Sequence, residues 1–142
     1  MSTPRFIDTS ILLYSISRDP EEARKREVAV ALLDRDDIAL SVQVLQEFYV
    51  EVTRDTRRHA LPPKVAAILV QTWQRFRVQE ITLPLVSNAL KISVIHGLSC
   101  WDATIVAAAR ALGCREILSE DLPNGREVEG VTINNPFAEV SV

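Results

Sequence analysis

Hydrophobic and polar residues follow two different periods along the chain. Short apolar runs, which are typical of buried strands, alternate with longer segments whose apolar residues recur at the i, i+3, i+4 spacing of one helix face. The short runs predict strands at residues 5–8, 37–41, 78–82, 115–119 and 130–134. The longer segments predict six helices, which begin at or near Thr9, Pro20, Ser41, Pro62, Pro84 and Ser99.

Capping and breaking residues support these boundaries. Ser41 and Ser99 can accept hydrogen bonds from the first free backbone amides of the helices that follow them. Proline occupies the first turn of three helices, and Gly97 and Gly113 follow the ends of two others. Strands and helices in this alternation favour right-handed crossovers between parallel strands. The sequence therefore predicts an α/β fold, a three-layer α/β/α sandwich with a central, mostly parallel, five-stranded sheet.

Composition narrows the class of protein. The 142 residues are 47% hydrophobic and 25% charged, an ordinary balance for one globular domain over residues 1–142. The net charge of −3 lacks the strong positive balance of a protein that binds duplex DNA mainly through its phosphates. Cys100 and Cys114 form no CxxC pair, and no apolar stretch has the length of a signal peptide or a membrane span. We therefore expect a cytoplasmic protein with no membrane association, whose cysteines serve in packing.

Four acidic residues are predicted to meet at one edge of the sheet. Asp8 follows the first strand, Asp121 follows the fourth, Glu47 lies in the helix after the second, and Asp102 lies in the first turn of a helix. Each has an ordinary explanation when taken alone: Asp8 as a helix cap, Glu47 as a surface residue, Asp102 as a partner of the Ser99 cap, and Asp121 as a turn residue. Independent caps and surface acids have no reason to converge at the carboxyl ends of the strands, where such sheets bind ligands.

A cluster of carboxylates predicts a bound cation. Close carboxylates repel one another, raise one another's pKa and destabilise the fold unless a cation neutralises them. Oxygen ligands without a convergent His or Cys suit Mg²⁺ or Mn²⁺, and Mg²⁺ commonly engages substrate phosphate. The sequence therefore predicts phosphoryl chemistry. The two histidines, His59 in a basic loop and His96 before a helix-ending glycine, are poor candidates for a general base.

Basic and aromatic residues leave two interpretations open. Five basic residues follow the helix that carries Glu47 and either guide a phosphate backbone toward the acids or form an ordinary solvated face. They are Arg54, Arg57, Arg58, His59 and Lys64. Trp101 beside Asp102 can stack a base, but burial statistics favour both Trp101 and Trp73 as core anchors, so neither is assigned to the site.

Four short motifs carry a family resemblance that spans essentially the whole chain. They are Phe6-Ile7-Asp8-Thr9-Ser10, Gln46-Glu47-Phe48, Trp101-Asp102-Ala103 and Ser119-Glu120-Asp121-Leu122. At these positions the chain resembles the PIN domain, in particular the VapC-type toxins of toxin–antitoxin pairs.

The resemblance implies a function and a set of site residues. It implies Asp8, Glu47 and Asp102 as the principal acids and Asp121 as a more variable fourth, for which Glu120 is the alternative. It also implies a homodimer and a Mg²⁺-dependent endoribonuclease, inhibited by an antitoxin whose tail enters the acidic groove. On this hypothesis a metal-activated water hydrolyses the phosphodiester of single-stranded or looped RNA.

Other functions fit the sequence less well. A haloacid-dehalogenase-like phosphatase needs a second Asp two residues after the first, where this chain has Ser10. A receiver-like phosphorylation module needs an Asp at the end of the third strand, which here ends in Thr82. The non-enzymatic alternative is a PIN-like scaffold that binds RNA or protein and uses the acids only as caps.

Overall fold

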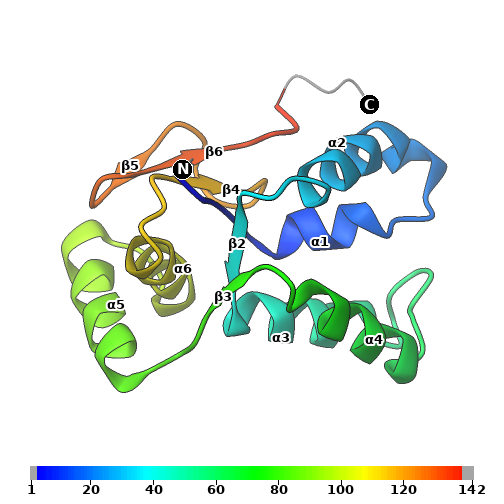
Figure 1. The fold of residues 1–142 in the computed structure, drawn as a ribbon, viewed down its shortest axis with the longest axis horizontal. Coiled ribbons are helices and arrows are strands. Elements are labelled where there is room, and N and C mark those ends of the chain that lie inside the picture. The colour runs from blue at the N-terminus through cyan, green and yellow to red at the C-terminus, as the bar shows by residue number, and fades with distance from the viewer. Residues whose placement is uncertain (1–2, 139–142) are drawn as a thin grey trace.

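A six-stranded sheet forms the centre of the computed structural model, which describes residues 3–138 (Figure 1). The strands are β1 (Arg5–Ile7), β2 (Ile38–Ser41), β3 (Arg77–Gln79), β4 (Glu116–Leu118), β5 (Glu127–Val128) and β6 (Val131–Asn134). Their order is β3-β2-β1-β4-β6-β5, and every neighbouring pair is parallel except β5 and β6. The mostly parallel sheet is confirmed, but the predicted number of five strands is wrong. β5 has two residues, too few for a hydrophobic period to reveal.

The predicted α-helices are present. They are α1 (Thr9–Ser15), α2 (Ala23–Leu33), α3 (Val42–Val52), α4 (Pro63–Trp73), α5 (Leu83–His96) and α6 (Cys100–Ala111), and a 3-10 turn, η1 (Pro20–Glu22), precedes α2. The third strand ends earlier than predicted because Thr82 caps α5, its Oγ accepting a hydrogen bond from the Leu85 N–H at 3.3 Å. Within residues 3–138 no single helix is long and apolar enough to cross a bilayer, and α5 and α6 reach that length only as a pair bent by 118°.

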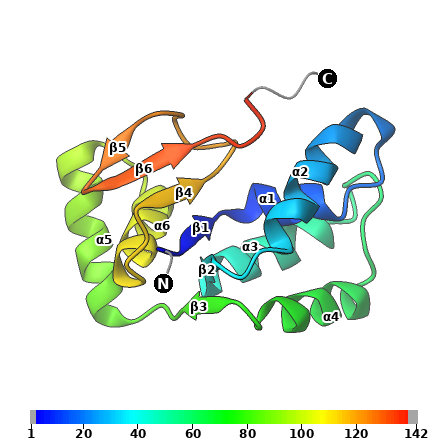
Figure 2. The same ribbon diagram turned by 45° about the horizontal axis from the view of Figure 1, so that its top comes forward.

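The connections place helices on both faces of the sheet. From β1 to β2 to β3 the chain steps toward one edge, and from β3 to β4 it crosses back to the other side of β1. Right-handed crossovers then require the helices of the first two steps and those of the last to lie on opposite faces. Figures 1 and 2 accordingly show α1 to α4 on one side of the strands and α5 and α6 on the other. The strand order therefore reverses at β1 and β4, where ligand sites form in open parallel sheets.

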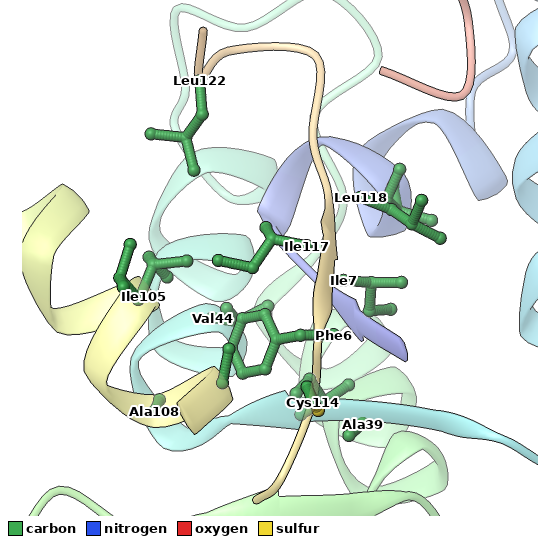
Figure 3. Close-up of a cluster of buried hydrophobic side chains, with 14 of the residues drawn as sticks. Phe6, Ile7, Ala39, Val44, Ile105, Ala108, Cys114, Ile117, Leu118 and Leu122 are labelled. Carbon is green, nitrogen blue, oxygen red and sulfur yellow. The ribbon is translucent and has the colours of Figure 1, made fainter. Parts of the chain in front are cut away.

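The core is built on the alternating side chains of the two central strands. Phe6 pairs in register with Ile117, and Ile7 pairs with Leu118. Because successive strand residues point to opposite faces, Phe6 and Ile117 point toward Ile105 of α6, whereas Ile7 and Leu118 point to the other face (Figure 3). All five side chains are buried. The central strands are therefore fixed on both faces, which holds their carboxyl ends in place.

Cys114 is a buried member of this core, just before β4. Burial raises the pKa of its thiol to about 11, so the reactive thiolate is scarcely populated at neutral pH. Cys100 at the start of α6 is half-buried, and both cysteines are free. These positions agree with the packing role expected from the sequence.

Helices α3 and α4 are joined by an aromatic pair. Phe48 is fully buried, and its ring meets that of Trp73 edge to face with 4.7 Å between the centroids. We predict that Phe48→Ala lowers the free energy of unfolding by about 3–5 kcal/mol, because it removes a buried ring and leaves a cavity. Val50→Ala on the same helix, at a side chain 60% exposed, should change it by less than about 0.5 kcal/mol. The free energy of unfolding of both variants is measured by chemical denaturation. An equal decrease in the two variants would contradict the prediction.

Candidate metal centre

Asp8 lies at the carboxyl end of β1, as the sequence predicted, and only 7% of it is exposed. Its Oδ1 accepts hydrogen bonds from the Ser10 N–H at 2.7 Å and the Ser10 hydroxyl at 2.8 Å, so it is also the N-cap of α1. Its Oδ2 accepts a hydrogen bond from the Ser119 hydroxyl. Asp8 can therefore cap α1 and also belong to a binding site. Three donors hold the carboxylate in one orientation.

The loop after β4 is shaped by Ser119, which is fully buried. The Ser119 hydroxyl oxygen accepts hydrogen bonds from the backbone amides of Asp121 and Leu122, both at 3.1 Å, while its proton is donated to Asp8. A single hydroxyl therefore links the end of β1 to the turn that carries Asp121. This link brings together two acids that lie 113 positions apart in the sequence.

The two neighbouring acids of that loop face different surroundings. Glu120 accepts hydrogen bonds from the Tyr14 hydroxyl and from Lys25 Nζ, the latter at 2.7 Å. Burial and the Glu120 carboxylate raise the pKa of Tyr14 to about 12, which keeps that hydroxyl protonated as a donor. Glu120 is thus tied to α1 and α2, whereas Asp121 interacts electrostatically with Asp8 and Asp102. The structure therefore favours Asp121 over Glu120 as the fourth acid at the sheet edge.

Asp102 and Glu47 approach the site from two helices. Asp102 is half-buried in the first turn of α6, where its backbone N–H donates to the capping Ser99 hydroxyl at 3.1 Å. Glu47 is an exposed residue in the second turn of α3, and it lines a groove together with Asp121. The Glu47 Oε1 accepts a hydrogen bond of 2.6 Å from Gln43. All four predicted acids therefore lie around the carboxyl ends of β1 and β4.

Charge and burial together disfavour the ionised form of two of these acids. Burial raises the pKa of Asp8 above its usual 3.8, the hydrogen bonds from Ser119 and Ser10 oppose this, and the charge of Asp121 adds to it. Partial desolvation also raises the pKa of Asp121, and the negative charges of Glu120 and Asp102 raise it further. Ionised carboxylates at this edge of the sheet therefore lower the free energy of unfolding of the metal-free protein.

The acids do not form a closed metal cage. Among residues 3–138, no three His, Cys, Asp or Glu side chains are arranged closely enough to hold an ion between them. Mg²⁺ does not need such a cage, because it keeps several of its waters and is commonly held by one or two carboxylates together with substrate phosphate. The oxygen donors and the uncompensated negative charge suit such a hydrated cation.

Two arginines from the end of α3 border the acids. Arg54 lines the groove that contains Glu47 and Asp121, and Arg57 lines an adjoining hollow that also contains Asp121. Both guanidinium groups pair with Glu51, at 2.9 Å for Arg54 and 3.0 Å for Arg57. Because two cations share one carboxylate, this group retains net positive charge next to the acids.

The other predicted basic residues lie farther from the acids. Arg58 and His59 line a different hollow, which Arg18, Arg57 and the acidic Asp19 and Glu22 also line. Lys64 is exposed in the first turn of α4. His96 lies at the end of α5, where its Nε2 is 2.9 Å from Glu129, so it is not near the acids. The basic residues therefore extend from the acids along the α3–α4 connection, with Arg54 and Arg57 nearest to the acids.

Sequence reasoning missed three contributors to this region. Trp73 is buried as predicted, but the expectation that Trp101 is a core anchor is wrong, because 70% of it is exposed beside Asp102. Gln43 and Ser119 were also missed, since their partners lie 58 and 111 positions away in the chain. A spacing of i, i+4 from Glu47 was the one signal available for Gln43.

A family model described as the PIN domain matches residues 5–122 of the chain. Among solved structures, the sarcin-ricin loop cleaving toxin VapC20 of Mycobacterium tuberculosis is 23% identical with a TM-score of 0.63, and the match covers 82% of this chain and 91% of that one. DNA-bound VapBC from Salmonella typhimurium is 18% identical with a TM-score of 0.65, over 95% of this chain and 99% of that one. A toxin–antitoxin complex from Klebsiella pneumoniae is 18% identical with a TM-score of 0.65, over 95% and 98%.

These structural likenesses show a shared fold over 82–95% of this chain. No curated protein matches the chain in sequence.

The raised pKa of Asp8 gives the stability of the metal-free protein a definite pH dependence. A carboxyl group with a raised folded-state pKa contributes stability that is present below the unfolded pKa, here near 3.8, and is lost as the pH rises through the folded pKa. We predict that Asp8→Asn, which keeps an N-cap acceptor, raises the melting temperature in EDTA at pH 7 by a few degrees. The gain should shrink as the pH is lowered toward 3.8.

A matched control is Asp37→Asn. Hydrogen bonds from Arg35 at 2.8 and 2.9 Å lower the pKa of Asp37, so the opposite sign is expected. Loss of that carboxylate should lower the melting temperature at pH 7. Thermal unfolding of the three proteins between pH 4.5 and 7.5 tests both statements, and an Asp8→Asn variant that melts below wild type throughout would contradict them.

Proposed function

Since the chain belongs to the PIN domain family, we propose that it is a Mg²⁺-dependent endoribonuclease, with Mn²⁺ as a substitute, and that it is the toxin of a toxin–antitoxin pair. The observation that carries the proposal is the buried Asp8 carboxylate at the carboxyl end of β1, which the Ser119 hydroxyl joins to the loop that carries Asp121. A buried carboxylate that lies close to two further acids, and that lowers the stability of the metal-free fold when ionised, is explained if these acids serve a cation.

The four carboxylates would hold the metal together with its waters, and they differ in how firmly the fold orients them. Asp8 is the most rigid, because Ser10 and Ser119 orient it. Asp102, Asp121 and Glu47 border the site from a helix turn, a loop and a second helix, so water or substrate can complete the coordination. A bound Mg²⁺ supplies an activated water and neutralises phosphate charge in such hydrolases.

The chain's own groups provide binding and orientation. The N-termini of α1 and α6 both lie at the site, and their positive dipole ends favour an anionic phosphate there. Arg57 borders the hollow that contains Asp121, in a position to contact a neighbouring phosphate. The exposed ring of Trp101, next to Asp102, offers a surface on which a base of single-stranded RNA can stack. We therefore propose single-stranded or looped RNA as the substrate.

The proposed partners are a cognate antitoxin and a second copy of the chain. The antitoxin rests on the family resemblance and on the toxin–antitoxin complexes among similar structures. A groove between α3, α4 and β3, lined by both apolar and polar side chains, is a surface on which an amphipathic partner segment could bind. Homodimerisation rests on the resemblance and on large apolar side chains exposed on α5, namely Leu83, Leu90, Val94 and Ile95. Such a toxin would act in the cytoplasm.

The proposal is tested by cleavage of a pool of structured cellular RNAs with and without Mg²⁺. We expect cleavage that EDTA abolishes and added Mg²⁺ restores. Asp8→Asn should reduce the rate by at least about a hundredfold, because the best-oriented acid loses its charge. The reduction is expected even though the same variant is more stable in its metal-free form, which separates a catalytic defect from unfolding.

Three results would argue against a metal-dependent endoribonuclease. If wild type cleaves RNA equally well without metal, the four acids do not act in cleavage as metal ligands. Absence of cleavage together with retained RNA binding, unaffected by Asp8→Asn, would favour the non-catalytic PIN-like scaffold. Release of inorganic phosphate from small phosphomonoesters would favour the phosphatase alternative.

The basic surface yields a separate prediction for substrate binding. Arg57→Ala should raise KM for a short single-stranded RNA by about tenfold, as expected for a charge-assisted contact to phosphate. It should also reduce the slope of log affinity against log salt by about 0.7, the contribution of one phosphate contact on a single strand. Lys91→Ala, an exposed cation on α5, is the control and should change neither quantity. If the salt slope of Arg57→Ala equals that of wild type, Arg57 does not contact phosphate and this surface is an ordinary solvated face.

A further inference from the structure

Gln43 joins the two helices that carry Glu47 and Asp102. It lies on α3, one turn before Glu47, and only 7% of it is exposed. Its Nε2 donates to Glu47 Oε1 at 2.6 Å and to the backbone carbonyl of Trp101 at 3.2 Å. Trp101 directly precedes Asp102 in the first turn of α6. One amide group therefore fixes a carboxylate of α3 relative to the helix turn that presents Asp102.

The chemistry of this contact requires a group with two donors. Both neighbours, a carboxylate oxygen and a backbone carbonyl, are acceptors, so the NH₂ end of the amide must face them. The carbonyl has a second lone pair and can accept from Gln43 while serving its own helix. Reversing the amide would place Oε1 against two other oxygens. The hydrogen-bond network thus determines the orientation of Gln43.

That orientation leaves an unpaired atom in the interior. Gln43 Oε1 is a buried side-chain oxygen without a hydrogen-bond partner among the described residues. A buried acceptor without a partner is costly, and native proteins rarely contain one without a further reason. An apolar residue at position 43 would avoid the cost. The glutamine is therefore not explained by the stability of the metal-free fold.

We propose that Gln43 is a positioning residue of the metal centre, which holds the Glu47 carboxylate on the side of α3 that faces Asp102 so that both acids serve one cation. The inference rests on the proposed function. Glu47 is otherwise an exposed side chain with several accessible rotamers, and the bond from Gln43 selects among them before a cation arrives. Gln43 therefore orients the Glu47 carboxylate and does not itself bind the metal or the RNA.

The test is the affinity of the metal-free protein for Mn²⁺, measured by isothermal titration calorimetry. Gln43→Met keeps the length of the side chain but removes both donors and the unpaired oxygen. We expect Mn²⁺ to bind about 10- to 100-fold more weakly, the range for loss of a residue that orients a ligand, while the melting temperature in EDTA equals or exceeds that of wild type. Gln71→Met, the same change at an exposed position of α4, should leave both quantities unchanged.

A double-mutant cycle distinguishes positioning from a general structural effect. If Gln43 acts through Glu47, then Gln43→Met should have no further effect on Mn²⁺ affinity when Glu47 is already replaced in Glu47→Gln. An equal weakening in both backgrounds would overturn the positioning role. Gln43→Asn is a second variant that preserves polarity but is too short to reach both acceptors, and it should weaken Mn²⁺ binding as well.

The outcomes separate this inference from the proposed function. If wild type binds Mn²⁺ and cleaves RNA but Gln43→Met binds as tightly, the inference alone is overturned. If wild type neither binds Mn²⁺ nor cleaves RNA with added metal, the proposed function and the inference both fall.

Discussion

The Asp8 carboxylate is buried at the carboxyl end of the central strand, and three hydrogen bonds from Ser10 and Ser119 only partly offset its desolvation. Much of the site depends on this arrangement. The same carboxylate starts α1, and the backbone N–H of Asp8 continues the β1–β4 ladder by donating to Leu118 at 3.1 Å. A change in its position would therefore disturb a helix, a strand pair and the loop that carries Asp121.

The cost of that burial is also what makes the site chemically useful. A carboxylate in water attracts cations weakly, because water screens its charge. At the sheet edge, Asp8 is shielded from water, and the nearby charge of Asp121 raises its affinity for positive charge, whether a proton or a metal ion. The same carboxylate oxygens therefore lower the stability of the metal-free protein and raise its affinity for a cation.

Rigidity is graded around the site. Asp8 is held by three donors, Asp102 is fixed by the first turn of α6, and Asp121 is held through its backbone rather than its side chain. Glu47 is an exposed side chain, and the contact from Gln43 compensates for that freedom. Open coordination by waters and substrate suits a hydrolase, because the scissile phosphate must enter and leave.

Much of this arrangement was accessible from the sequence. The six helices, five of the six strands, the mostly parallel sheet and the position of all four acids at its edge follow from local periodicity, caps and the rule for parallel crossovers. β5 was missed because two residues carry no period. The helix that contains Trp101 was predicted, but its exposed position was not, since tryptophan is buried more often than not.

The sequence by itself determined which residues form each element and which acids follow which strand, because these depend on contacts between neighbours along the chain. Only the tertiary structure decided that Glu120 faces Tyr14 and Lys25 while Asp121 faces the other acids. It alone decided that Ser119 and Gln43 reach partners 111 and 58 positions away. Such contacts arise when strands and helices assemble, and no local pattern encodes the direction in which a loop side chain then points.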